Sequence, residues 1–371
     1  MKFLDGTYMM GKNLLLVNLS KNTKYITLNN LEAERYGHRV FNLADYPRPE
    51  HKKLKHIEYS PATEAAFIEN IYRLVAKHNI DYVATQCEVL YPMIDKLTVP
   101  TLPKMGIPVD TLVNKEKYAQ FCHWNGIDHP ATLVPDRIED IAHTFDGAIF
   151  VKPTNGCDGS RRLYLTEDKY SMFDYMRYDS PQHFLDLLTK YGGVDDFKNT
   201  QANGKNMRRG KGLIGIKGRH MVQECVVGSK ESTAVNLIIA NNQIQFTLLC
   251  RCGNIFSDKM FYFSDTTNTT LHCDKDMSVN HSQVRDYIGE KEFTVLMDTL
   301  HKIKDAAKIE LALINLHMME YAKGKYYIQD LQLRPGGSVA LTIKTPEQEA
   351  SKNYRRILFD EYDYPSIWEY V

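Results

Sequence analysis

The 371-residue chain lacks the long apolar runs that a membrane-spanning helix needs. Its longest apolar segments, such as Leu14 to Val17 and Leu237 to Ala240, have the length of a β-strand and are too short to cross a bilayer. Residues Met1 to Gly6 contain no apolar core of signal-peptide length. We therefore expect no membrane partner.

An excess of charge of either sign is also absent, because 46 basic side chains balance 46 acidic ones. This balance argues against binding nucleic acid or a membrane surface through bulk electrostatics. The least regular part of the chain, residues 192–219, is a basic insert, but its basic run at 205–219 has no interleaved aromatic side chains on which bases could stack. We interpret the insert as a solvated loop or a positively charged lid, and we expect no nucleic-acid partner.

Cysteine is too sparse and too irregular for a disulfide framework. The seven cysteines are an odd number in a large chain. Cys250 and Cys252 form a single CxC pair, and no second pair completes a zinc site. Buried, reduced thiols are the simplest interpretation, which predicts a cytoplasmic protein.

The first hundred residues alternate between strand and helix patterns. Short apolar runs at 12–19, 39–43 and 81–85 predict strands, and Thr63 to His78 has apolar residues at helical spacing. This alternation predicts an α/β unit built on a small parallel sheet. No G-x-G-x-x-G follows the first strand, so the dinucleotide-binding fingerprint is missing.

Strand patterns dominate the later part of the chain, so the overall class is α/β with α+β character. Helices are predicted at 114–125, 168–191, 292–308 and 346–370. Strands are predicted at 131–134, 148–152, 162–165 and 221–225, and as two hairpins at 234–251 and 311–331. We divide the chain into three units at 1–110, 111–221 and 222–371.

A lysine precedes a glycine-rich turn in the second unit. Lys152 ends an apolar strand pattern, and the turn from Asn155 to Ser160 contains Gly156 and Gly159. A lysine in this position can reach a phosphate while backbone N–H groups of the turn close over it. The alternative is a surface lysine before an ordinary β-turn, and the segment alone does not decide between them.

The segment from Gln223 to Glu231 has the pattern of a strand that ends in a hinge, with an acid at each end of the hinge. Val226 and Val227 offer apolar walls for an adenine ring, and the backbone from Glu224 to Val227, which includes Cys225, offers donors and acceptors for its edge. The second acid, Glu231, can accept hydrogen bonds from both ribose hydroxyls. An ordinary strand followed by a turn is the alternative.

Oxygen ligands for a hard cation recur near the end of the chain. Asp330 and Gln332 lie two residues apart in a strand pattern and therefore face the same side. Carboxylate and amide oxygens suit Mg²⁺ that bridges phosphates. His317 and Asn315 lie on the partner strand and can complete the shell, while Arg334 follows two residues later, where it can hold a carboxylate or an acyl phosphate.

Taken in order, these segments resemble the ATP-grasp family, the carboxylate–amine or carboxylate–thiol ligases that include D-alanine–D-alanine ligase, biotin carboxylase and carbamoyl phosphate synthetase. The resemblance extends from about Val113 to Lys344, and the first unit looks like the family's pre-ATP-grasp domain. It implies ATP with Mg²⁺ or Mn²⁺ as cofactors, and a carboxylate and an amine as substrates. It also implies a homodimer, because related ligases are often homodimers.

The resemblance also implies roles for individual residues. Lys115 and Lys152 look like the family's two phosphate-binding lysines, and the loop from Asn155 to Ser160 looks like its mobile cover over the β- and γ-phosphates. Glu224 to Val227 resembles the adenine hinge, and Glu231 the ribose-binding acid.

The catalytic residues implied by the resemblance are Arg334, Lys259 and Arg251. Arg251 and Lys259 resemble positions where other members place cations near the phosphates, and Arg334 would steady the acyl phosphate. Asp330 and Gln332 stand where the family usually has Glu and Asn.

The partner strand usually supplies an Asp or Glu as a further metal ligand. Here the nearest candidates are His317, Asn315 and Glu320, and a His ligand is unusual for Mg²⁺. The sequence thus predicts an ATP-dependent carboxylate ligase. A small-molecule kinase of the same fold and a catalytically silent nucleotide-binding protein are the alternatives.

Overall fold

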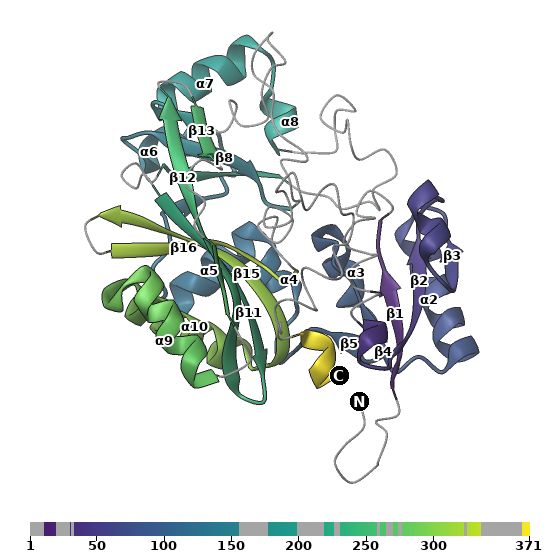
Figure 1. Cartoon of the computed structure of the whole chain (residues 1–371). Coiled ribbons are helices and arrows are strands. Elements are labelled where there is room, and N and C mark those ends of the chain that lie inside the picture. The colour runs from purple at the N-terminus through teal and green to yellow at the C-terminus, as the bar shows by residue number, and fades with distance from the viewer. Residues whose placement is uncertain are drawn as a thin grey trace.

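Three β-sheets organise the chain (Figure 1). The computed structural model describes residues 11–19, 30, 33–155, 177–198, 219–225, 231–257, 260–264, 270–273, 277–322, 325–334 and 366–371. The sheets have five, four and seven strands, and they occupy separate regions of the molecule. None of the described helices is long and apolar enough to span a membrane.

The five-stranded sheet is parallel throughout, as predicted, with the order β3-β2-β1-β4-β5. Its strands are β1 (Asn13–Val17), β2 (Arg39–Ala44), β3 (Ile57–Tyr59), β4 (Tyr82–Ala84) and β5 (Thr101–Leu102). Helix α2 (Glu64–His78) packs on one face. The Thr63 hydroxyl caps its first turn, and Asn79 ends it in the left-handed conformation, which confirms the predicted helix.

Helical segments lie between the strands of this sheet and after it. Segment η2 (Pro49–Lys53) lies between β2 and β3, and η3 (Glu88–Leu90) and α3 (Tyr91–Ile94) lie between β4 and β5. Helices α4 (Asp110–Val113) and α5 (Lys115–Trp124) come after the last strand of the sheet. The side chain of Asn114 accepts hydrogen bonds from the backbone N–H groups of Glu116 and Lys117, which fixes the start of α5 where the sequence predicts it.

The four-stranded sheet has the order β7-β10-β8-β9. Its strands are β7 (Thr132–Leu133), β8 (Ile149–Pro153), β9 (Arg177–Tyr178) and β10 (His220–Glu224). One face packs against α6 (Asp140–Thr144), α7 (Pro181–Lys190) and α8 (Val194–Lys198), through the core residues Ile149, Val151, Tyr178, Phe184, Phe197 and Val222.

The single helix predicted at 168–191 is wrong. Residues 177–178 form a strand that pairs with β8, and the helix begins only at Pro181. Ser180 caps this helix by accepting a hydrogen bond from the His183 N–H, and proline is favoured in the first turn. The start of the predicted helix and the predicted strand at 162–165 lie outside the described residues.

The seven-stranded sheet has the order β13-β12-β11-β15-β16, with β14 paired to β12 and β6 to β15. Its strands are β6 (Lys104–Met105), β11 (Glu231–Ala240), β12 (Gln243–Ser257), β13 (Met260–Ser264), β14 (Thr270–His272), β15 (Ile309–Ala322) and β16 (Lys325–Gln332). Asn241 and Asn242 both have positive φ, which confirms the two-residue hairpin turn between β11 and β12.

Two long helices, α9 (Met277–Ile288) and α10 (Glu290–Ala307), cover one face of this sheet (Figure 1). Val235, Leu316 and Leu331 point into that core. Helix α9 was not predicted from the sequence. Strand β6, at residues 104–105, already belongs to the large sheet, and the unit boundaries at 110 and 221 stay predictions.

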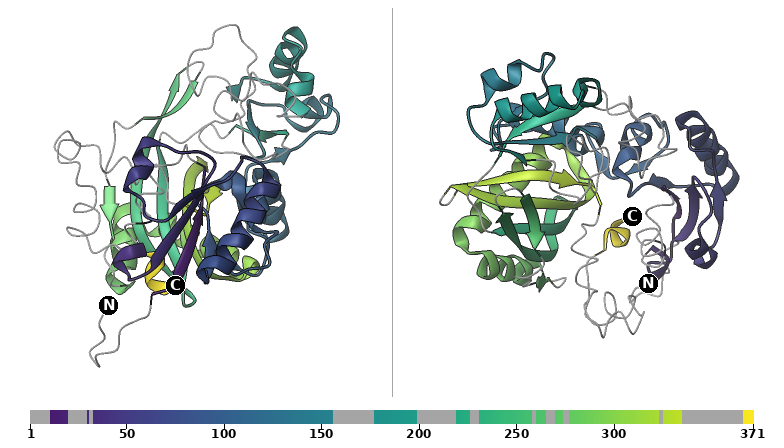
Figure 2. Two further views of the ribbon diagram at one scale, coloured as in Figure 1. Left: turned by 90° about the vertical axis from the view of Figure 1, so that its right-hand side faces the viewer. Right: turned by 90° about the horizontal axis from the view of Figure 1, so that it is seen from above.

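The end of the chain packs between the first and third sheets. Segment η6 (Ile367–Tyr370) lies between them in both Figure 1 and the right view of Figure 2. Trp368 packs with Leu14 and Leu16 of β1 and with Ile238 of β11. Residues 346–365 of the predicted C-terminal helix lie outside the described residues, and 367–370 form a 3-10 turn.

Candidate active site

The face of the large sheet that the helices leave uncovered carries polar residues at its centre. The register aligns Asn236, Asn315 and Gln332 in one row across β11, β15 and β16. The next row holds Ala234, His317 and Asp330. Asn236 and Asn315 are both 1% exposed. Buried amides in the middle of a sheet are uncommon unless they meet a partner or a ligand.

Asn315 is the most informative residue of this face. Its Nδ2 donates to the Asn236 Oδ1 at 3.1 Å and to the Val235 carbonyl at 3.3 Å. These bonds orient the amide, and its buried Oδ1 has no hydrogen-bond partner in the part of the chain that the structure describes. An orphaned buried acceptor is costly, so it indicates a place for a cation or a donor.

The donor set of this face fits a hard cation in part. Asn315 and Gln332 supply amide oxygens, and the register adds Asp330, whose side chain lies outside the description. No cluster of three or more His, Cys, Asp or Glu side chains is present among the described residues. The sequence candidate Glu320 pairs with Tyr326, which packs into the helix-covered core, so Glu320 is not in these rows.

The small sheet also has a polar face, opposite α6 and α7. Lys152 lies on it and is only 2% exposed. Lys115, at the start of α5, is held near Lys152 because its backbone N–H donates to the Thr154 carbonyl at 2.9 Å. The Asn114 side chain donates to the Asn155 Oδ1 at 2.5 Å. This backbone bond places the start of α5, with Lys115, beside the end of β8, which carries Lys152, the other lysine predicted to bind phosphates.

Gln223 and Arg177 share this face, and sequence reasoning gave neither a role. The Gln223 Nε2 donates to the Thr132 hydroxyl at 3.0 Å. The Gln223 Oε1 and the Arg177 Nε are buried without a hydrogen-bond partner among the described residues. Gln223 alternates with Val222, which packs into the core on the other face, whereas Arg177 lay inside a segment predicted to be helical.

The predicted hinge connects the two polar faces. Glu224 ends β10 of the small sheet, and Glu231 begins β11 of the large sheet. The backbone N–H groups of Glu224 and Cys225 donate to the carbonyls of Ala131 and Ala148. The Cys225 thiol has a raised pKa because of its burial. Val226 and Val227, together with the side chain of Glu231, lie outside the description.

Tyr327 of β16 lies near Glu224, the residue at which β10 ends. Tyr327 stacks on Tyr321 with ring centroids 3.8 Å apart. Burial, with added repulsion from Glu224 and Asp128, raises the pKa of Tyr327 to about 12. The large sheet therefore comes near the end of β10 in the small sheet.

Solved structures share the overall fold of this chain. An L-amino acid ligase from Bacillus licheniformis superposes with a TM-score of 0.61 at 17% identity, over 89% of this chain and 70% of that one. An N5-carboxyaminoimidazole ribonucleotide synthetase from Thermotoga maritima gives 0.53 at 14% identity, over 96% and 78% of the two chains. A carboxyaminoimidazole ribonucleotide synthase from Aspergillus clavatus, complexed with ATP, gives 0.55 at 12% identity, over 97% and 79%.

The chain has the ATP-grasp fold. This confirms the resemblance drawn from the motifs and the fold class predicted from the sequence. No family model matches the sequence, and the search of curated proteins found no match either.

Within this ATP-grasp fold, Arg251 is not brought to the polar face. It pairs in register with Thr233, on the helix-covered side of β11 and β12. Its Nη2 donates to the Glu292 Oε2 at 3.1 Å and to the Ile288 carbonyl at 3.3 Å, and Thr233 donates to the other oxygen of Glu292. The position favours a structural role over the catalytic one predicted. Lys259, Gly156, Gly159 and Ser160 lie outside the described residues.

Arg334 lies where the large sheet meets the parallel sheet. Its Nε donates to the Glu88 Oε1 at 2.9 Å, and the two side chains are 7% and 5% exposed. The Tyr91 hydroxyl donates to the neighbouring Leu333 carbonyl at 2.6 Å. Glu88 and Tyr91 were not predicted, because no local pattern marks a residue that acts on a partner 246 positions away.

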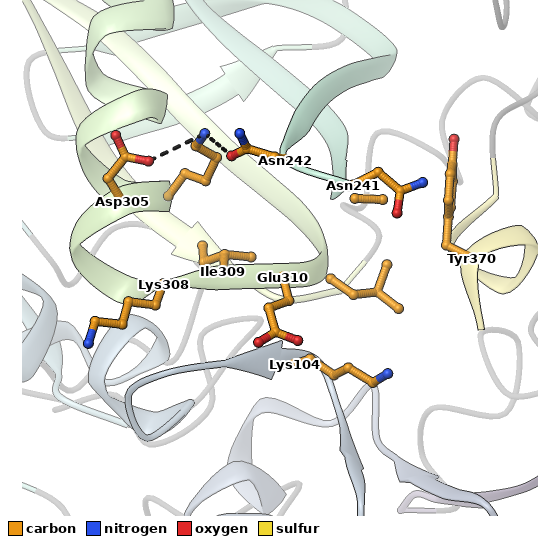
Figure 3. Close-up of a pocket in the computed structure, with 11 residues that line it drawn as sticks. Lys104, Asn241, Asn242, Asp305, Lys308, Ile309, Glu310 and Tyr370 are labelled. Carbon is orange, nitrogen blue, oxygen red and sulfur yellow. Dashed lines mark hydrogen bonds and ion pairs between the residues drawn. The ribbon is translucent and has the colours of Figure 1, made fainter.

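A cavity of about 550 Å³ lies elsewhere, between the β11–β12 turn, the end of α10 and Tyr370 (Figure 3). The Lys304 Nζ in its wall donates to the Asn242 Oδ1 at 2.6 Å and lies 3.3 Å from Asp305. The Lys104 Nζ contacts the Tyr82 hydroxyl at 3.0 Å. None of the predicted site residues lines this cavity, so it is separate from the candidate active site.

Proposed function

We propose that the protein is an ATP-dependent ligase that activates a carboxylate as an acyl phosphate and joins it to an amine, forming ADP and phosphate. The observation that carries the proposal is the pair of buried polar sheet faces joined at residues 225–230. The small face bears Lys152, with Lys115 bonded through its backbone beside it, and the large face bears oriented amides with an orphaned acceptor. Neighbours of the same fold are named as ligases and synthetases, and several are ATP or ADP complexes.

The two lysines would neutralise the ATP phosphates. Lys152 is held on β8, and Lys115 is attached through its backbone to the residue that follows β8. Both positions are fixed by backbone bonds, so little reorganisation would be needed when ATP binds. Positioned positive charge of this kind stabilises the charge that develops during phosphoryl transfer.

A divalent cation, Mg²⁺ or Mn²⁺, would be held by Asp330, Gln332 and the Asn315 Oδ1. Bound there, it would neutralise charge on the ATP phosphates. Asn315 cannot rotate to hide its oxygen without breaking its two bonds to β11. The role of His317 as a further ligand of this cation stays a prediction.

The reaction would proceed in two displacements. A carboxylate oxygen of the substrate attacks the γ-phosphorus, the bond to the β–γ bridging oxygen breaks, and ADP leaves with its electron pair. The amine nitrogen then attacks the acyl carbon, loses a proton, and displaces phosphate. Arg334 would steady the acyl phosphate, while Glu88 holds its guanidinium in place.

The silent-protein alternative has one observation in its favour. The described rows of the large sheet offer amides and a histidine, and Asp330 is the single carboxylate that the register adds. Fewer carboxylates mean a weaker site for a divalent cation. The homodimer, the cytoplasmic location and the absence of nucleic-acid partners also stay predictions.

Turnover of Mg-ATP by the purified protein tests the proposal, with ADP and phosphate followed against pooled carboxylates and amines. The ligase predicts stimulated release of both products, lost in Lys152→Met and retained in Lys190→Met, which removes an exposed lysine from α7 of the same unit. ADP without free phosphate would indicate the kinase. ATP binding without turnover in any pool would support the silent protein.

A further inference from the structure

The connections of the parallel sheet change direction between β1 and β4. From β1 the chain continues to β2 on one side, whereas β4 leads to β5 on the other. In open α/β sheets, ligands bind outside the carboxyl ends of strands at such a point. Asn18 follows β1 here, and Thr85 and Gln86 follow β4.

A small crevice lies at this position. Its volume is about 40 Å³, and its wall includes Thr85, Gln86, Leu16, Leu333 and Trp368. One water molecule needs about 10–15 Å³ measured this way, so the crevice has room for a small functional group and not for a whole substrate. Leu333 in the wall directly precedes Arg334, a residue of the candidate active site. The crevice is therefore adjacent to that site along the chain.

Two residues of the crevice wall, Gln86 and Trp368, each carry a buried polar atom without a hydrogen-bond partner within the described part of the chain, the Gln86 Oε1 and the Trp368 Nε1. Asn18, which is hydrogen-bonded to the Gln86 backbone, adds a third such atom, its Nδ2. Asn18 and Trp368 are 1% and 4% exposed. The Asn18 Oδ1 accepts from the Gln86 backbone N–H at 3.1 Å, which orients the amide and leaves its Nδ2 as the unused donor. Three unused groups together indicate an external partner.

These atoms define a chemical class. The indole N–H and the Asn18 amide are donors, and the Gln86 Oε1 is an acceptor. A carboxamide complements all three, because its oxygen accepts two hydrogen bonds and its nitrogen donates. A carboxylate has no hydrogen to donate to the Gln86 oxygen, so the two oxygens would repel one another. An ammonium group has no acceptor for the two donors.

We propose that this crevice binds an uncharged carboxamide group of the substrate. The inference rests on the proposed function and narrows it: one of the two joined molecules carries a carboxamide, as an asparagine or glutamine side chain does. Glu88 and Arg334, which follow Gln86 and Leu333 closely in the chain, form an ion pair with one another.

Tryptophan fluorescence tests binding without needing turnover. The chain has two tryptophans, and Trp124 is 75% exposed, so Trp124→Phe leaves Trp368 as the single reporter in the crevice wall. We expect a saturable change with millimolar propionamide, and at least tenfold weaker binding of propionate at equal ionic strength.

Variants in this background test the residues. Asn18→Asp keeps the acceptor for the Gln86 N–H and removes the free donor, so it should weaken propionamide binding at least tenfold. Asn241→Asp, the same change at an exposed turn, should have no effect. Gln86→Met removes the acceptor at similar volume and gives a second variant should Asn18→Asp not fold.

Equal binding of propionate would overturn the carboxamide assignment. No saturable response to either compound, or unchanged propionamide binding in both crevice variants, would show that the crevice holds only water. ATP turnover is measured on the same preparation. If ATP is turned over but propionamide does not bind, the carboxamide assignment is wrong and the proposed function is unaffected. If propionamide binds but ATP is not turned over, the result counts against the proposed function alone.

Discussion

Replacing Glu88 by Gln should destabilise the protein strongly, because it leaves the Arg334 guanidinium buried without its carboxylate. The pair is joined at 2.9 Å, and the side chains are 5% and 7% exposed, so water screens the charge poorly. Removing one partner of a buried ion pair costs about 3–5 kcal/mol. Gln can still accept the Nε–H bond, so we expect a loss of about 3 kcal/mol in the free energy of unfolding.

The measurement is urea unfolding followed by circular dichroism, with a double-mutant cycle. Arg334→Met alone should also destabilise, since it leaves Glu88 charged and buried. The double variant Glu88→Gln with Arg334→Met removes both charges, and it should recover most of the loss. This recovery is the signature of coupling between the two residues.

The matched control is the surface pair of Arg137 and Asp140, joined at 2.8 Å with side chains 76% and 32% exposed. Asp140→Asn should leave the unfolding midpoint nearly unchanged, because exposed ion pairs contribute little. If Glu88→Gln behaves like this control, or if the two single losses simply add in the double variant, the reasoning about the buried pair is refuted.

Three further outcomes follow from the same contacts. Lys152→Met should weaken ATP binding by about 10- to 100-fold in calorimetry, since charge-assisted hydrogen bonds contribute about 1.5–3 kcal/mol, while Lys190→Met should not; equal effects would contradict the assignment. Tyr91→Phe should cost about 1–3 kcal/mol in urea unfolding, because the buried Leu333 carbonyl loses its donor. Burial lowers the pKa of His38, so the unfolded chain binds the proton first, and stability should fall as pH drops below about 6.5 until the folded pKa is reached. His38→Asn should flatten this part of the stability–pH profile, and an unchanged slope would show that another group titrates.

Elements with chemically marked ends could be predicted from the sequence. Thr63 and Asn79 bracket α2, and the Asn241–Asn242 pair forms the hairpin turn where it was expected. Helix caps and tight turns are determined by three or four neighbouring residues, so they can be recognised without the rest of the fold. The motif order was also informative, because the ATP-grasp fold that it implied is the one observed.

Predictions that depend on long-range packing were less successful. Arg251 was expected near the phosphates, but its strand carries polar residues on both faces, and only the pairing with Thr233 places it under α10. Glu88 became visible only through its contact with Arg334. A residue's face and its distant partners are set by tertiary structure, which short sequence patterns do not encode.

For the predicted hinge at 224–231 and the glycine-rich loop at 155–160, the structure describes only some of the residues. The backbone of Lys115 is bonded to Thr154, two residues after Lys152, and the roles of both lysines at the phosphates stay predictions. The assignments of Gly156, Gly159, Ser160, Val226 and Val227 stay predictions, because these residues lie outside the description.

The central claim is the acyl phosphate, and isotope transfer tests it most directly. A carboxylate substrate found in the pooled assay is labelled with ¹⁸O in its carboxyl group, and the phosphate released with ADP is analysed by mass spectrometry. Attack of the carboxylate on the γ-phosphate predicts one ¹⁸O in each phosphate released during amide formation. Phosphate without the label would mean that water attacks ATP directly, and this result would contradict the ligase mechanism.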